Sequence, residues 1–106
     1  MITSAINTRP LLARNIEVTE DSLMADLSDG RSITVPLAWY PRLLNGTPRE
    51  KSNWRFIGRG EGIHWPDLDE DIRVADLVAG KPSRESQRSF KRWLEKKNAM
   101  IEEGES

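Results

Sequence analysis

Apolar and polar residues alternate with a period of two in the first third of the chain. The alternation runs over residues 16–19, 23–28 and 33–35. This period is typical of strands that are buried on one side only. Because the connections between the three segments are short, the sequence predicts a three-stranded antiparallel meander.

The turn between the second and third segments sets their register. A two-residue loop at Asp29 and Gly30 would place Ile33 opposite Asp26 and divide the apolar face. A three-residue loop that ends at Gly30 places Ile33 opposite Ala25, and it needs the left-handed backbone that glycine adopts readily. We predict the three-residue loop, because it gives one continuous apolar face.

The period becomes helical after Pro36. Apolar residues in the segment 37–44 fit short helical turns, which Pro41 keeps from extending. The segment Thr47-Pro48-Arg49-Glu50 has a capping residue, a proline at the first helical position and a glutamate three residues after the cap. This capping box predicts a short helix.

Further short strands and one more helix follow. Large apolar and aromatic side chains predict strands at residues 54–57 and 63–65, with the glycine-rich segment 58–62 as the loop between them. A last element begins near Ile72 and continues into a short helix that ends at Gly80. We therefore predict an α+β domain over residues 1–80, in which two or three further short strands and short helices accompany the meander.

The longest helical pattern begins at Ser83 and ends near Ile101. Lys81-Pro82-Ser83 joins it to the preceding domain, because proline ends one element and serine caps the next. The residues of its apolar stripe, which Lys97 interrupts, are Phe90, Trp93, Leu94 and Ile101. A helix this amphipathic needs a covering surface, so we expect Trp93 to be covered and residues 102–106 to fray.

Charge divides the chain at the same point. The whole sequence carries 16 basic and 17 acidic side chains, a net charge of −1. Residues 1–80 hold 9 basic and 12 acidic groups, whereas residues 81–106 hold 7 basic and 5 acidic groups. The near-neutral total therefore combines an acidic α+β domain with a basic amphipathic C-terminal helix.

Composition excludes several classes of site. The chain has no cysteine and one histidine, which removes disulfides, thiolate nucleophiles and cysteine-ligated zinc. No apolar run approaches the roughly 20 residues of a membrane span, and residues 1–10 lack the apolar core of a signal peptide. We expect a cytoplasmic protein that needs no membrane and no cofactor.

The glycine-rich segment Gly58-Arg59-Gly60-Glu61-Gly62 invites comparison with phosphate-binding loops. It lacks the Lys-Ser/Thr pair of a Walker loop and lies between two predicted strands, so we interpret it as a turn. Its flanking glycines allow close backbone approach. Arg59 is therefore the residue here that best suits a phosphate or a partner's carboxylate.

An acidic segment follows His64. On a strand, Asp67, Asp69 and Asp71 would share one face, and their mutual repulsion favours open water, a basic partner or a cation. The spacing does not match an EF-hand loop. His64 with these carboxylates is also the one pair in the sequence that offers acid–base chemistry.

These motifs together resemble the bacterial domain of unknown function 2442 family, over about residues 12–80. The resemblance implies a small α+β domain without assigned catalytic residues. Some members look like partners in toxin–antitoxin gene pairs, and some carry a C-terminal helix-turn-helix, which the single helix predicted after residue 80 cannot form. The matching stretches are Leu27–Arg31, Leu37–Leu43, Asn53–Arg55, Gly58–Pro66 and Asp69–Ile72.

The leading functional hypothesis is a non-enzymatic protein-interaction module, the antitoxin-like partner of a basic toxin. The C-terminal helix would dock into a partner's groove or onto a second copy of the chain. The residues predicted to bind a partner are Arg59, His64, Trp65, Asp67, Asp69, Asp71, Phe90 and Trp93.

Two alternatives belong to other classes. One is a nucleic-acid-binding regulator, and the other is a small enzyme or metal-binding protein centred on His64. The regulator would use the basic residues Arg84, Arg88, Arg92 and Lys96.

Overall fold

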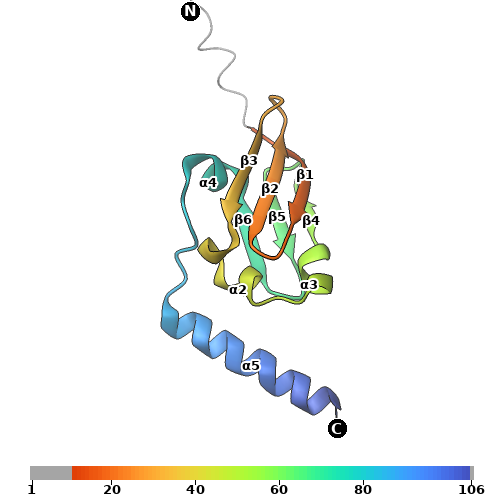
Figure 1. Ribbon diagram of the computed structural model, residues 1–106, viewed down its shortest axis with the longest axis vertical. Coiled ribbons are helices and arrows are strands. Elements are labelled where there is room, and N and C mark those ends of the chain that lie inside the picture. Colours follow the sequence, from red (N-terminus) through yellow and green to blue (C-terminus); the bar gives the residue numbers. More distant parts are fainter. Residues whose placement is uncertain (1–10, 106) are drawn as a thin grey trace, which may run out of the picture.

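The computed structural model describes the backbone of residues 11–105 and the side chains of residues 11–99. Residues 1–10, for which we expect no signal peptide, and the Ile101 side chain lie outside these limits. Two three-stranded antiparallel sheets lie one in front of the other and form the body of the α+β fold (Figure 1). The strands are β1 Ala13–Val18, β2 Ser22–Leu27 and β3 Ser32–Pro36, then β4 Arg55–Ile57, β5 Gly62–Trp65 and β6 Glu70–Arg73.

The first sheet has the predicted register. Ile33 pairs with Ala25, and the three-residue loop is closed by the Leu27 amide, which donates to the Arg31 carbonyl at 2.7 Å. Gly30 has a φ of 93°, the left-handed conformation that this loop requires. The prediction is confirmed because the turn and the apolar alternation favour the same register.

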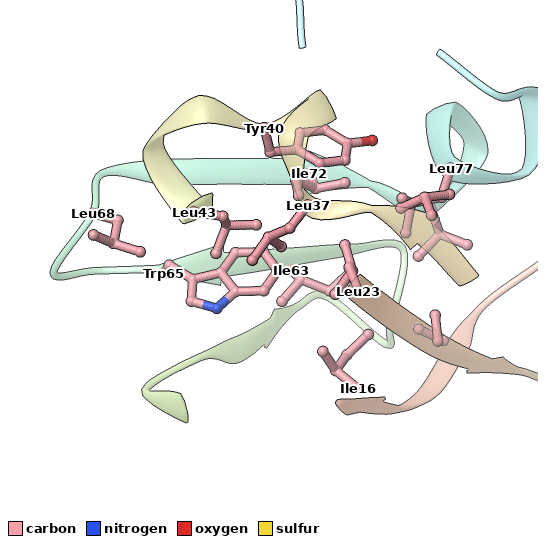
Figure 2. Packing of buried hydrophobic residues seen from close by; sticks show 14 of the residues in the cluster. Ile16, Leu23, Leu37, Tyr40, Leu43, Ile63, Trp65, Leu68, Ile72 and Leu77 are labelled. Atoms are coloured by element: carbon pink, nitrogen blue, oxygen red, sulfur yellow. The ribbon is translucent and has the colours of Figure 1, made fainter. Parts of the chain in front are cut away.

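The core lies between the two sheets. Leu23 and Ala25 from the first sheet and Ile63 and Trp65 from the second are all almost fully buried. In Figure 2, Trp65 lies under Leu43 and Leu37 and beside Ile63. The indole Nε1 of Trp65 donates to the Lys51 carbonyl at 3.0 Å, so the ring's polar atom is satisfied inside the core.

Short helical segments close the ends of this core. The capping box is confirmed: the Glu50 amide donates to Thr47 Oγ1 at 3.1 Å, and the Thr47 amide donates to Glu50 Oε1 at 2.8 Å. Gly80, with a φ of 72°, ends the last short helix as predicted. The segments are η1 Leu37–Trp39, α2 Pro41–Leu44, α3 Pro48–Ser52 and α4 Val74–Ala79.

The long helix α5 spans Gln87–Glu105 and extends along one end of the body (Figure 1). The predicted start at Ser83 is wrong by four residues, because the Ser83 amide donates to the Trp39 carbonyl at 3.0 Å and holds this segment against the body. Ser86 caps the helix instead, accepting from the Ser89 amide at 3.1 Å. The helix also includes residues 102–105, for which the sequence predicts fraying. Within the described part of the chain, no helix is long and apolar enough to cross a membrane.

Gly60 joins the two sheets. Its carbonyl accepts from the Ala13 amide at 2.8 Å, and its φ is 114°. A Cβ at this position would lie 2.4 Å from the Ala13 carbonyl oxygen. The loop therefore needs glycine both for its backbone conformation and for the close approach of strand β1.

Gly60→Ala is expected to lower the free energy of unfolding by about 2–3 kcal/mol, since backbone strain and a steric clash add together. Gly30→Ala is the matched control, because Gly30 also has a positive φ but a Cβ there would meet no atom within 4 Å. In the control, the free energy of unfolding is expected to fall by only about 1 kcal/mol. Chemical denaturation of both variants measures the difference, and equal losses would contradict the role of the Gly60–Ala13 contact.

Candidate functional site

The second sheet has an exposed outer side. Arg55 pairs with His64, and His64 pairs with Asp71, so these three side chains form one row across the sheet. Ile57 and Arg73 lie two residues along β4 and β6 and point to the same side. We call these five residues the outer face.

A contact between His64 and Asp71 occupies the centre of the outer face. The Nδ1 atom of His64 contacts the Asp71 carboxylate in a short interaction. The His64 side chain is 22% exposed and that of Asp71 is 64% exposed. Among the described residues, Ile57 is one of three large apolar residues that stay exposed, at 43%. The outer face thus combines an accessible apolar group with charged and titratable groups.

The acidic segment does not form a continuous strip on a strand. Strand β6 begins only at Glu70, and Asp69 has a positive φ in the turn before it, so the shared face that a strand over residues 67–71 would give does not form. Asn53 Nδ2 donates to the Asp67 carboxylate at 2.8 Å, whereas Asp71 contacts His64. Among the described side chains, no group of three or more potential ligands could hold a metal ion.

Two other predicted partner residues have different environments. Trp65 is fully buried, so its predicted role in binding a partner is wrong. Arg59 is exposed in the turn between β4 and β5, as predicted for the glycine-rich segment. Its amide donates to Glu61 Oε2 at 3.0 Å, which orders the turn and leaves the guanidinium at the surface.

Arg42 fastens helix α5 to the body. Its Nε and Nη2 atoms donate to the Glu85 carboxylate at 2.9 Å and 2.5 Å, and its Nη1 donates to the Asp69 carbonyl at 2.9 Å. The guanidinium carbon lies 5.2 Å from the ring centroid of Trp93. Hydrogen bonds from Arg42 hold the pKa of Glu85 below its ordinary value.

A second cation also lies near the ring of Trp93. Lys97 Nζ contacts Glu50 Oε1 at 2.9 Å and lies 5.9 Å from the Trp93 centroid. The ring of Phe90 stacks on that of Trp93, with 5.8 Å between the ring centroids. Trp93 is therefore covered, as predicted, and its own chain supplies part of the cover. The apolar stripe that the sequence offers to a partner is used in large part within the chain.

The exposed surface of α5 beside and behind Trp93 is basic. Arg88, Lys91, Arg92 and Lys96 are all exposed, and we call them the basic face. Arg84 does not belong to it, because α5 begins at Gln87 and Arg84 lies in the preceding segment. Spacing by four predicts three of these residues but misses Lys91, which lies three residues after Arg88.

The family model described as "Protein of unknown function (DUF2442)" matches residues 13–83, more than half of the chain. The chain belongs to this family. The confirmed resemblance includes both sheets and the outer face, whereas α5 begins after the matched residues. A search of the curated proteins finds no match.

Solved structures share the DUF2442 fold. A crystal structure of a protein of unknown function from Rhodospirillum rubrum ATCC 11170 has 21% identity and a TM-score of 0.63, covering 74% of this chain and 98% of that one. The solution structure of uncharacterized protein CV0863 from Chromobacterium violaceum has 18% identity and a TM-score of 0.58, covering 76% of this chain and 74% of that one. At these identities the likeness supports the fold alone.

A small polar cavity lies where the DUF2442 region meets the segment before α5. It has a volume of about 220 Å³, and Tyr40, Glu70, Lys81 and Arg84 are among its lining residues. The Tyr40 hydroxyl donates to the Lys81 carbonyl at 3.3 Å. Burial raises the pKa of Glu70 to about 7, against the opposing effect of Arg42. Burial also raises the pKa of Tyr40 to about 12, with Asp76 and Glu70 adding to the effect.

The raised pKa of Glu70 makes stability depend on pH. Because the folded chain holds this proton more tightly than the unfolded chain, the contribution to stability is present below about pH 4.5 and is lost as pH rises past about 7. We expect a loss of about 1–2 kcal/mol between pH 5 and pH 8, after allowing for partial exposure. Glu70→Gln is expected to remove this slope. Urea denaturation at several pH values tests the expectation, and an unchanged slope in Glu70→Gln would contradict it.

Proposed function

We propose that the protein is a non-enzymatic protein-interaction module and that its partner contacts the outer face. The observation that carries the proposal is the exposed row Arg55–His64–Asp71, which lies beside the exposed side chain of Ile57. Arginine is enriched in protein interfaces, and an accessible apolar group gives such a contact a dry centre.

The charges of the outer face indicate the chemistry of the partner. Within the described part of the chain, neither Arg55 nor Arg73 has an ion-pair partner within 4 Å, whereas Asp71 is paired with His64. A guanidinium binds a carboxylate through two parallel hydrogen bonds. The partner surface that fits best therefore presents carboxylates towards Arg55 and Arg73.

The finer role that we propose is the antitoxin-like member of a toxin–antitoxin pair, acting in the cytoplasm. What supports it is the family resemblance, together with the small size of the domain. The acidic segment of the sequence favours a toxin that is basic overall, and the carboxylates that meet Arg55 and Arg73 would be a local patch on its surface. Asp67 and Asp71 each have a partner within the chain, so they are less available to a basic toxin. The guanidinium groups of the outer face, unpaired within the described part of the chain, therefore offer a more specific contact than the net negative charge of the acidic segment.

The experiment is affinity purification of the tagged full-length chain from its native host, followed by a binding measurement with the partner that is recovered. Reversing both charges in Arg55→Glu/Arg73→Glu is expected to weaken that binding by about 10–100-fold. Arg14→Glu is the matched control, because Arg14 is exposed on strand β1 of the other sheet.

The toxin–antitoxin role has its own test. Expression of the neighbouring gene product is expected to arrest growth, and co-expression of this chain is expected to relieve the arrest. The proposal fails if no partner is recovered and the neighbouring product is harmless alone. It also fails if the double reversal and Arg14→Glu bind the partner equally well.

A further inference from the structure

We propose that the basic face of α5 binds the phosphodiester backbone of a nucleic acid. Arg88, Lys91, Arg92 and Lys96 form this surface, which lies on a different element from the outer face. The inference does not depend on the proposed protein partner. It rests on how the body holds α5 and on which side of the helix is left exposed.

The docking contacts determine which side of α5 faces the solvent. Trp93 and Lys97 face the body, where they contact Arg42 and Glu50. At about 100° per residue, Arg88 and Lys91 lie about 140° and 160° from Trp93 around the helix axis. Arg92 lies about 100° from it and Lys96 about 60°. Arg88 and Lys91 are therefore turned away from the body, whereas Arg92 and Lys96 lie at the side of the helix, and all four are exposed on the helix that Figure 1 shows along the end of the fold.

The basic face has a regular spacing and little acidic compensation. Arg88, Arg92 and Lys96 are each four residues apart, so successive charges are separated by roughly 6 Å along the axis. Glu95 is the one acidic residue of α5 among the side chains that the structure describes. None of the four cations has an ion-pair partner within 4 Å in that same part of the chain.

A membrane surface is a poorer match than a nucleic acid. An amphipathic helix binds a bilayer by inserting its apolar side between the head groups. In α5 the apolar side holds Trp93, which is packed against the core, and Phe90, which stacks on it. The side that remains accessible supplies charge without an apolar stripe.

An acidic protein is also a poorer match. Stable protein interfaces usually have an apolar or aromatic centre surrounded by polar groups. The basic face contains no aromatic or large aliphatic side chain, whereas guanidinium and ammonium groups in a row suit regularly spaced phosphates. The overall charge of −1 gives no long-range attraction, so binding must come from this local row.

The test is fluorescence anisotropy with a labelled 20-base-pair DNA duplex of mixed sequence and a single-stranded RNA of the same length. Four phosphate contacts predict that duplex affinity falls by about 150-fold between 50 and 200 mM salt, and single-stranded binding falls less steeply. Arg88→Ala/Arg92→Ala is expected to lower the slope of log K against log salt by about 1.8. The control Arg14→Ala, which removes an exposed charge from β1, should leave the slope unchanged.

Circular dichroism checks that the variants keep their helix content, and the single substitution Arg92→Gln gives a milder version of the same test. Binding of either nucleic acid that depends on Arg88 and Arg92 supports the proposal, and the two probes distinguish duplex from single strand. The absence of binding to both probes at 50 mM salt would overturn it. Binding of polyglutamate as tight as the binding of the nucleic acids would also overturn it, because the basic face would then suit an acidic protein.

Discussion

The guanidinium of Arg42 connects three parts of the chain that are distant in sequence. It is bonded to Glu85 in the segment before α5, to the Asp69 carbonyl in the turn before β6, and it lies over the ring of Trp93. Only 16% of the Arg42 side chain and 11% of the Glu85 side chain are exposed. A pair this sheltered is screened little by salt, and removing one member leaves a poorly solvated charge.

Helix α5 depends on this interaction because it has few other means of staying attached. An isolated helix of this length is marginal in water, and its stability in a protein comes from packing of an apolar side. Here Trp93 supplies most of the apolar contact, with Phe90 stacked beside it, and Lys97 adds an ion pair with Glu50. The position of Arg42 therefore determines which side of α5 is exposed and where its basic face points.

Local features of the fold could be predicted from the sequence, because neighbouring residues determine them. The three-residue loop at Gly30 and the capping box at Thr47 each involve groups within a few positions of one another. The start of α5 could not be predicted in the same way. Ser83 is a plausible cap by itself, but its amide is bonded to Trp39, which is 44 residues away in the chain.

In the candidate site, too, local features could be predicted from the sequence and contacts between strands could not. The sequence groups His64 with the carboxylates of residues 67–71, but which of them it contacts depends on the register between β5 and β6. The aromatic character of Trp65 fits a core and a binding surface equally, and only the position of the first sheet decides between them. The role of Arg42 left no local signal, because its partners lie 27 and 43 positions away.

Hydrogen exchange of the α5 amides in Arg42→Gln tests most directly whether Arg42 holds the helix in place. Protection over residues 90–99 is expected to fall at least tenfold, while the amides of strand β2 keep the protection of the wild type. Arg49→Gln, an exposed arginine on α3, should leave both regions unchanged. Wild-type protection of α5 in Arg42→Gln would contradict the claim that this residue fixes the helix on the body.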